Sequence, residues 1–257
     1  MNFLDTFLKL TEYTITYGQE HLLKPYLPEN HIEDGCGNYY VVIGKSRTCF
    51  TCHMDTASWH MEKVNHVIDG NYIRSDGTTI LGSDDKNGMT ILLYMIERNI
   101  PGTYYFFAGE ESGMAGAHKI ISKNKNFFSD NFDRMVSFDR RGYDSVITHQ
   151  MGRRGCTDEF GDALAKELNK SGLNYYLDRT GIYTDSASFM GIIPNVTNLS
   201  CGYSGEHTHS EITDIEYVEL LARAACRVRW ERLPKEGVPK IDDSMRKYYY
   251  DDEDWYF

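Results

Sequence analysis

The stretch Gly82-Ser83-Asp84-Asp85-Lys86-Asn87-Gly88 is the segment around which the rest of this sequence is organised. Four further short polar segments have the same character, and each of the five follows a run typical of a β-strand; the four are residues 52–56, 109–111, 138–140 and 205–207. Together they offer histidine and carboxylate side chains, which are ligands that suit two zinc ions. Two neighbouring ions need one bridging carboxylate, and Asp84 is the candidate.

Hydrophobic periodicity around these segments predicts alternating strands and helices. The expected strands are 39–43, 48–52, 64–68, 72–74, 103–108, 134–138, 145–149 and 195–199. The expected helices are 3–10, 18–26, 88–98, 115–122, 157–170 and one that a capping box at 213–216 opens and that stops before Pro234. This alternation predicts a three-layer α/β/α fold with a mixed, mainly parallel central sheet. Ligands of such sheets collect beyond the carboxyl ends of the strands.

Composition is consistent with one large domain. The chain has 257 residues, of which 41% are hydrophobic, so it can bury a core of its own. We predict a single catalytic domain over residues 1–234 and an acidic, aromatic tail over 235–257, whose aromatic side chains could dock on the domain. The six cysteines show no disulfide-scaffold spacing and are expected to be reduced and partly buried.

The charge and the termini exclude several classes of partner. A net charge of −11 argues against nucleic acid. No apolar run is long enough to span a bilayer, so no membrane partner is expected. The first residues lack the layout of a signal peptide, which predicts a cytoplasmic location.

Two pairs of polar residues carry most of the chemical information. Glu110 and Glu111 are adjacent acids after a buried strand, where they repel each other unless a cation is present. One of them could bind a metal while the other acts as a base on water. His53 and Asp55 are two residues apart in an extended segment, so they share a face and the carboxylate can orient the imidazole.

The remaining candidates each have an ordinary structural alternative. Asp139 could cap a helix or pair with Arg140 or Arg141. His207 lies in a Gly/Ser-rich loop and could simply be exposed, and His209 competes for its role. Each motif alone is weak evidence. The five motifs together, in one α/β pattern, favour a metal centre.

At this point the sequence resembles the co-catalytic di-zinc exopeptidases of clan MH, which include bacterial leucyl aminopeptidases, glutamate carboxypeptidase and tripeptidase T. The resemblance runs from about residue 10 to 232 and rests on residues 34–39, 52–56, 82–88, 109–113 and 205–211. It implies one zinc ion held by His53 and Asp139, and a second held by Glu111 and His207. Asp84 would bridge the two ions, and Co²⁺ or Mn²⁺ could substitute for zinc.

The resemblance also assigns roles to the neighbours of these ligands. Glu110 would be the general base and Asp55 would support His53 as the second catalytic residue. Asp185 resembles part of a family loop near the site. The family often has a cis peptide after the bridging aspartate, which would here join Asp84 and Asp85.

Motif spacing indicates which branch of the family the chain resembles. Only 67 residues separate Asp139 from His207, too few for the lid domain that the carboxypeptidase-like branch inserts there. Another branch inserts a domain between the first histidine and the bridging aspartate, and here 30 residues separate His53 from Asp84. The chain therefore resembles the lid-less aminopeptidases, with the phosphorylase/hydrolase-like fold of the zinc aminopeptidases.

The expected function is that of a zinc-dependent metallopeptidase, most simply an aminopeptidase acting on peptides, with N-acylated amino acids as the other substrate class. A deacylase or carboxypeptidase on the same centre is the first alternative, in which an arginine binds a substrate carboxylate. The candidates are Arg140, Arg141, Arg153 and Arg154. A non-catalytic binding protein that keeps the fold is the second alternative. The sequence predicts no oligomeric state.

Overall fold

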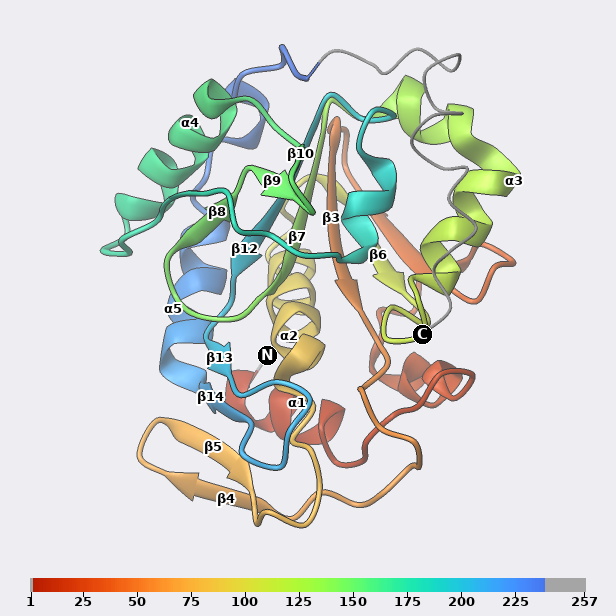
Figure 1. Ribbon diagram of the computed structural model, residues 1–257, viewed down its shortest axis with the longest axis vertical. Coiled ribbons are helices and arrows are strands. Elements are labelled where there is room, and N and C mark those ends of the chain that lie inside the picture. The colour runs from red at the N-terminus through yellow and green to blue at the C-terminus, as the bar shows by residue number, and fades with distance from the viewer. Residues whose placement is uncertain (1, 239–257) are drawn as a thin grey trace.

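The computed structural model describes residues 2–238 and is built on one eight-stranded sheet (Figure 1). In spatial order the strands are β1 (Ile32–Glu33), β2 (Tyr39–Ile43), β6 (Gly102–Phe107), β3 (Thr48–His53), β7 (Arg134–Arg140), β12 (Asn195–Ser200), β8 (Ser145–Ile147) and β11 (Tyr176–Asp178). The four central strands, from β6 to β12, are parallel to one another. The sheet turns antiparallel where β2 pairs with β6 and where β8 pairs with β12. The mixed, mainly parallel sheet is as predicted.

Helices cover both faces of this sheet, which gives the predicted three layers (Figure 1). One face packs against α1 (Phe3–Leu10), α2 (Ser83–Glu97), α4 (Asp158–Asn169) and α5 (Ile215–Ala225), and the other against α3 (Ala115–Asn131) and the 3₁₀ helix η2 (Asp185–Phe189). Strand side chains alternate between the two cores: Phe50 packs on the α2 side, and its neighbour Cys49 packs on the α3 side. Both faces are therefore apolar, which explains the continuous hydrophobic runs of the central strands.

A small second sheet lies at one end of the domain. It contains β13 (Tyr203–Ser204), β14 (Ile212–Asp214), β5 (Tyr72–Ser75) and β4 (His66–Asp69), all antiparallel. β4 and β5 form the hairpin predicted around Asp69-Gly70-Asn71. Because β5 pairs with β14, the chain that leads into α2 is fixed beside the loop that carries His207. The remaining elements are short: η1 (Glu20–Tyr26), β9 (His149–Gln150), β10 (Arg153–Arg154) and η3 (Trp230–Arg232).

The structure refines three sequence-based expectations. Helix α2 is bounded at Ser83, but Asp84 and Asp85 have non-helical backbone angles, so Asp84 lies in a kinked segment and the regular helix begins after it, close to the predicted start at residue 88. Helix α3 extends to Asn131, but it is kinked at Asn124, close to the predicted end at residue 122. The N-cap of α5 is Asp214, whose side chain accepts the Tyr217 N–H, because the hydroxyl of Thr213 is engaged with Asn87 instead.

Other expectations have simpler outcomes. The six cysteines all lie within the described residues, and none of them forms a disulfide. Within residues 2–238, no helix has both the length and the hydropathy required to cross a bilayer. Most of the predicted tail lies outside the described residues, so the domain boundary at residue 234 stays a prediction.

Candidate metal centre

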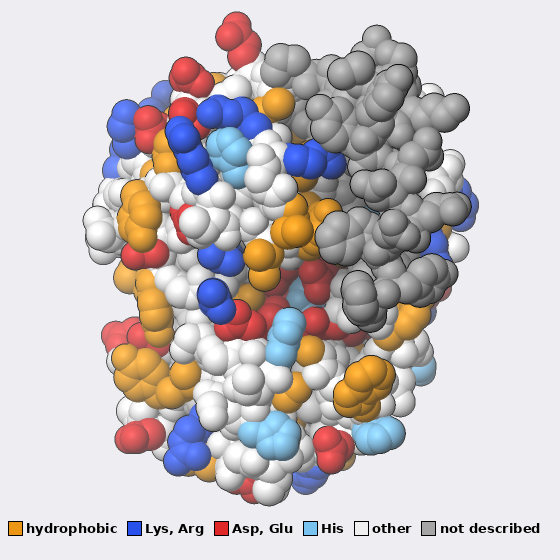
Figure 2. Space-filling view, viewed as in Figure 1, with side chains coloured by type: hydrophobic (Ala, Val, Ile, Leu, Met, Phe, Trp, Pro, Cys, Tyr) orange, Lys and Arg blue, Asp and Glu red, His pale blue; other side chains and the backbone are white. Residues whose placement is uncertain are grey.

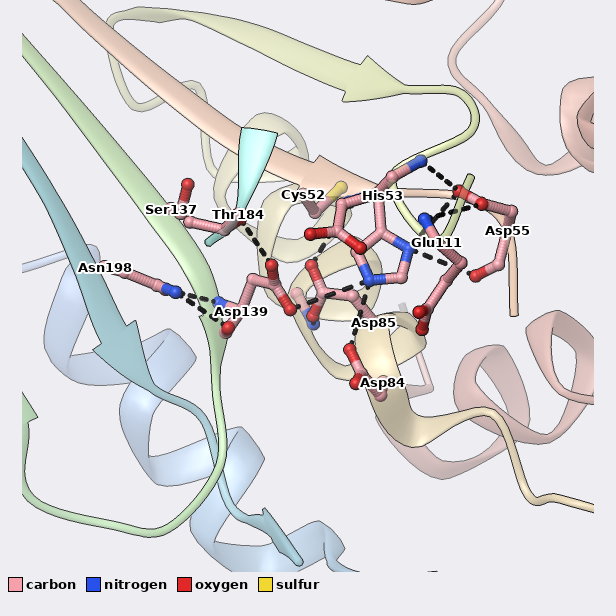
Figure 3. A network of polar contacts seen from close by, with 12 residues as sticks. Cys52, His53, Asp55, Asp84, Asp85, Glu111, Ser137, Asp139, Thr184 and Asn198 are labelled. Carbon is pink, nitrogen blue, oxygen red and sulfur yellow. Dashed lines mark hydrogen bonds and ion pairs between the residues drawn. The ribbon is translucent and has the colours of Figure 1, made fainter. Parts of the chain in front are cut away.

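The predicted ligands converge at the carboxyl edge of the central sheet (Figure 3). His53 is the last residue of β3, and Asp139 lies next to the last residue of β7. Glu111 follows β6 in a tight turn, and His207 lies in the loop between β13 and β14. Asp84 reaches the same point from the kinked segment at the start of α2. Five segments that are far apart in the sequence thus meet at one edge of the sheet.

The carboxylate of Asp84 lies between the two histidines. Its Oδ1 is 3.1 Å from His53 Nε2, and its Oδ2 is 3.2 Å from His207 Nε2. The peptide bond between Asp84 and Asp85 is cis, as the family resemblance implies. Each oxygen of one carboxylate therefore faces a different imidazole, which is the arrangement that a bridging ligand requires.

Each histidine also faces a second carboxylate. His53 Nε2 is 3.6 Å from Asp139 Oδ1, and His207 Nε2 is 2.9 Å from Glu111 Oε1. Two ligand atoms that bind one zinc ion in tetrahedral geometry lie roughly 3.4 Å apart, given metal–ligand distances near 2.0–2.2 Å. The observed separations surround this value. The two groups, His53 with Asp139 and His207 with Glu111, each share Asp84 and each match the donor set of a zinc site.

Hydrogen bonding alone leaves this cluster unsatisfied. His207 Nε2 lies near both Asp84 Oδ2 and Glu111 Oε1, and a ring N–H can point well at only one of them. Glu111 Oε1 is buried, and His207 is its one possible donor within residues 2–238. A buried carboxylate oxygen without a partner is costly in a protein interior. A divalent cation would satisfy both carboxylates at once, so the residues present fit a metal pair.

Asp55 contacts both the two glutamates and the imidazole of His53. Its Oδ1 accepts the backbone N–H of Glu110 and its Oδ2 that of Glu111, each at 3.1 Å. The ring Nδ1 of His53 instead lies 3.1 Å from the backbone carbonyl oxygen of Asp55, and the carboxylate is 3.5 Å away. Figure 3 shows Asp55 on the side of the His53 ring opposite Asp139. Asp55 therefore contacts the His53 ring through its carbonyl oxygen and, at a longer distance, through its carboxylate.

Glu110 and Glu111 point in different directions, as expected for adjacent residues. The side chain of Glu111 reaches His207, whereas Glu110 lines an open cleft together with Asp84 and Asp139. Of the two competing histidines it is His207 that contacts the cluster, although its side chain is 52% exposed. Among the described residues, no contact joins His209 to the cluster.

Two buried residues beneath Asp84 were not singled out from the sequence. Asp85 is fully buried, and it accepts the N–H of His53 at 3.2 Å and that of Gly88 at 3.0 Å. Although its carboxylate comes within 4.8 Å of ligand atoms of His53 and Asp139, these bonds commit it to the backbone. Lys86 is also fully buried, and its Nζ donates to the carbonyl oxygen of Asp55 at 3.0 Å. Their position directly after Asp84 was the only sequence signal.

Glu211 holds the loop that carries Asp84. This fully buried carboxylate accepts three hydrogen bonds, from Gly82 N at 2.7 Å, Ser83 Oγ at 2.8 Å and Asp84 N at 2.9 Å. Burial raises the pKa of Glu211 to about 7, because these bonds offset only part of the desolvation. The sequence signal was its position four residues after His207. The loop that supplies the last histidine therefore also fixes the bridging aspartate.

Asp139 is fixed from β12 and from the turn before η2. The Asn198 side chain accepts the Asp139 N–H at 2.9 Å and donates to the Asp139 carbonyl oxygen at 2.8 Å, and the Thr184 hydroxyl donates to the carboxylate (Figure 3). Asp185, which the resemblance places near the site, is buried, and neither of its carboxylate oxygens has a hydrogen-bond partner within residues 2–238. Burial raises the pKa of Asp185 well above its usual range, which favours its neutral form.

The pKa shifts describe a site that lacks positive charge. Burial raises the pKa of Glu110 and of Asp139 well above the usual range, and neighbouring carboxylates add to the effect. Burial opposes a charged imidazole at His53, but the surrounding carboxylates, Asp139 first, raise its pKa well above normal. The carboxylates of Asp84 and Glu111 raise the pKa of His207 to about 11. Without a metal, protons supply the missing positive charge.

Comparison with solved structures shows that the fold is that of known peptidases. The aminopeptidase PepT of Bacillus cereus superposes with a TM-score of 0.75 at 18% identity, over 89% of this chain and 97% of that one. A tripeptidase of Staphylococcus aureus gives a TM-score of 0.72 at 18% identity, over 89% and 97%. The TET1 peptidase of Pyrococcus horikoshii gives 0.65 at 15% identity, over 90% and 100%. The fold implied by the resemblance is confirmed.

Sequence comparison reaches less far. No family model matches the chain. An uncharacterised protein of Bacillus subtilis, YqjE, is 45% identical over 97 residues, which is 34% of this chain and 26% of that protein. The chain thus matches about a quarter of the length of this curated relative.

Replacing Glu211 tests its role in holding the Asp84 loop. Glu211→Gln replaces one of the two carboxylate oxygens that face the loop with an NH₂ group. This group cannot accept a hydrogen bond from the backbone N–H groups of the loop. We expect zinc affinity to fall about 10- to 100-fold, the usual cost of losing a residue that orients a metal ligand. Competition titration with a zinc chelator measures it. Glu219→Gln, on the exposed face of α5, is the control and should bind zinc as the wild type does. Unchanged affinity in Glu211→Gln would contradict this role.

The pKa shifts also predict how stability depends on pH. Glu110 and Asp139 have raised pKa values, so above their usual 4.5 and 3.8 their ionisation destabilises the metal-free folded state. His207 stabilises that state below its usual 6.5 and loses this contribution as pH rises toward about 11. Asp84 has a lowered pKa and the opposite sign, but its contribution is lost only as pH falls below 3.8. Between about pH 5 and 8, the metal-free protein therefore loses stability as pH rises.

Metal binding has the reverse dependence, because the ligands must release protons to bind the ion. We expect the difference in melting temperature between zinc-loaded and chelator-treated protein to widen steadily from about pH 5.5 to about pH 8. Differential scanning fluorimetry in matched buffers measures both curves. A difference that stays constant or narrows over this interval would rule out the proposed link between these ligands and the metal.

Proposed function

We propose that the chain is a two-metal hydrolase that removes N-terminal residues from peptides, with zinc as its metal. One observation carries the proposal: a single carboxylate, Asp84, faces two separate histidine–carboxylate groups, and Glu110 lines the same cleft. A binding protein would have no need of a second carboxylate beside the metal ligands. The solved structures that share the fold include an aminopeptidase and a tripeptidase, which supports the same reaction class.

The metals would be held by His53 with Asp139 and by Glu111 with His207, with Asp84 between them. When bound, such ions polarise the scissile carbonyl and lower the pKa of the attacking water. Glu110 is the residue placed to take the proton of that water and to pass it to the leaving amine.

The other residues of the chain keep Glu110 and the ligands in position. Asp55 accepts the backbone N–H groups of both glutamates. The Glu110 side chain then projects into the cleft, whereas the Glu111 side chain points toward His207. Asn198 and Thr184 fix Asp139, and Glu211 fixes Asp84. A substrate with a free amine would find several carboxylates around the centre to bind its positive charge.

Metal content and a peptide panel test this function together. Protein reloaded with zinc should contain two ions per chain and should cleave a neutral tripeptide with a free amine faster than its N-acetylated form. Preferred cleavage of the acetylated peptide would indicate a deacylase. Release of the C-terminal residue first would indicate a carboxypeptidase. Two bound ions without cleavage of any peptide would favour a binding protein, and a single ion at saturating zinc would refute the two-metal site.

Two substitutions separate the roles of the adjacent glutamates. Glu110→Gln keeps the shape of the side chain but cannot accept a proton, so turnover should fall at least ~10²-fold while zinc content stays near two ions. Glu111→Gln should instead weaken one zinc site, because an amide is a poorer ligand than a carboxylate. Zinc titration and steady-state kinetics distinguish the variants. If Glu110→Gln loses metal while Glu111→Gln keeps it, the two roles are reversed.

A further inference from the structure

The cleft beside the metal centre contains positive charge that the proposed mechanism does not use. The cleft, about 720 Å³ including the part open to solvent, is lined by Arg140 and Arg141 as well as by Asp84, Glu110 and Asp139. Figure 2 shows acidic and histidine side chains gathered in a hollow of this face, with Lys or Arg side chains at its border.

The two arginines are held in different ways. Arg141 is exposed and forms an ion pair with Glu206 at 2.9 Å, which neutralises much of its charge. Arg140 has only 13% of its side chain exposed, and its contacts all involve Nη2: they are long hydrogen bonds of 3.3 and 3.4 Å to Thr180 and an approach of 3.8 Å to Asp178. Its N–H groups on Nε and Nη1 have no acceptor within residues 2–238.

Asp178 is also a weak partner for Arg140, because its oxygens already accept other hydrogen bonds. Its Oδ1 accepts the N–H and the hydroxyl of Thr180, each at 2.7 Å, and its Oδ2 accepts the hydroxyl of Ser145 at 2.9 Å. A guanidinium binds carboxylates best through two parallel N–H groups, which Asp178 does not engage. Arg140 is therefore a largely buried cation with donors left for an anion from outside the domain.

A local irregularity of β7 explains how Arg140 comes to line the cleft. In a regular strand, successive side chains point to opposite faces, so Asp139 and Arg140 would diverge. Here the register between β7 and β12 shifts: Ser137 lies opposite Asn198, whereas Arg140 lies opposite Ser200. β7 thus contains one additional residue, and such a bulge redirects the side chains around it. Both Asp139 and Arg140 consequently reach the cleft.

We propose that Arg140 binds a carboxylate of the substrate beside the metal centre, so that the enzyme prefers peptides that carry a negative charge within reach of this subsite. The proposal rests on the peptidase function proposed above. The carboxylate can come from an acidic N-terminal side chain or from the C-terminus of a short peptide. Both sources present the same planar anion to the guanidinium.

Three matched tripeptides distinguish the sources. The first has an acidic N-terminal residue and an amidated C-terminus, the second a neutral N-terminal residue and a free C-terminus, and the third is neutral and amidated. In Arg140→Gln, kcat/KM should fall about 10- to 100-fold for whichever carboxylate peptide uses the subsite, mainly through KM, as for one charge-assisted hydrogen bond. The neutral, amidated peptide should change less than about 2-fold.

Arg154→Gln is the matched control, since Arg154 pairs with Asp158 outside the cleft and should leave all three values unchanged. An equal loss for all three peptides in Arg140→Gln would mean that Arg140 is structural, and no loss for any of them would refute the subsite. If the wild type cleaves none of them, the proposed function fails and calorimetric titration with the same peptides decides this point. If Arg140→Gln then binds a carboxylate peptide more weakly than the wild type does, and binds the neutral, amidated peptide equally well, the subsite is supported. If the variant and the wild type bind all three peptides with the same affinity, the subsite is refuted.

Discussion

Electrostatic repulsion among buried carboxylates is the constraint on which this structure depends. Acidic side chains from five separate segments meet at one edge of the sheet, where few water molecules can screen them. Three of these carboxylates, Asp55, Asp85 and Glu211, accept backbone N–H groups, and Lys86 adds one buried cation. The carboxylates of Asp84, Asp139 and Glu111 instead face the two histidines. They are the group for which a divalent cation is the natural partner, and this distinction separates ligands from supporting residues.

These charged side chains lie at the ends of strands and in the segments that follow them, not in the hydrophobic core between the sheet and the helices. Strands β3, β6 and β7 are parallel and end at the same side of the sheet. The closeness of His53, Glu111 and Asp139 therefore follows from the direction and order of these strands. Asp84 and His207 require the small antiparallel sheet, because the β5–β14 pairing fixes the two loops beside each other. The main sheet thus supplies one half of the candidate centre and the small sheet the other.

The fold class could be predicted from the sequence, because it follows from strand periodicity. The ligand set and the separate roles of Glu110 and Glu111 rest on the family resemblance and stay predictions. The kinked backbone of Asp84 and Asp85 at the start of α2 could not be read from the residue pattern, since an acidic pair there is indistinguishable from a polar turn. The support from Glu211 depends on a contact between residues 129 positions apart, which a local pattern cannot reveal. Arg140 and Arg141 are likewise equivalent in sequence, and only the additional residue in β7 and the packing of Asp178 distinguish them.

The bonds from Glu211 to the Asp84 loop have a consequence for the order of folding. They join the first half of the domain to a segment near its C-terminal end, and such long-range contacts form late because the intervening chain must first become ordered. During synthesis, residues 1–200 can pair most of the central sheet before residue 211 has been made. The candidate metal centre can therefore be completed only late in synthesis. A nascent chain that lacks residues 207–211 has most strands of the central sheet but only one of the two candidate ligand groups.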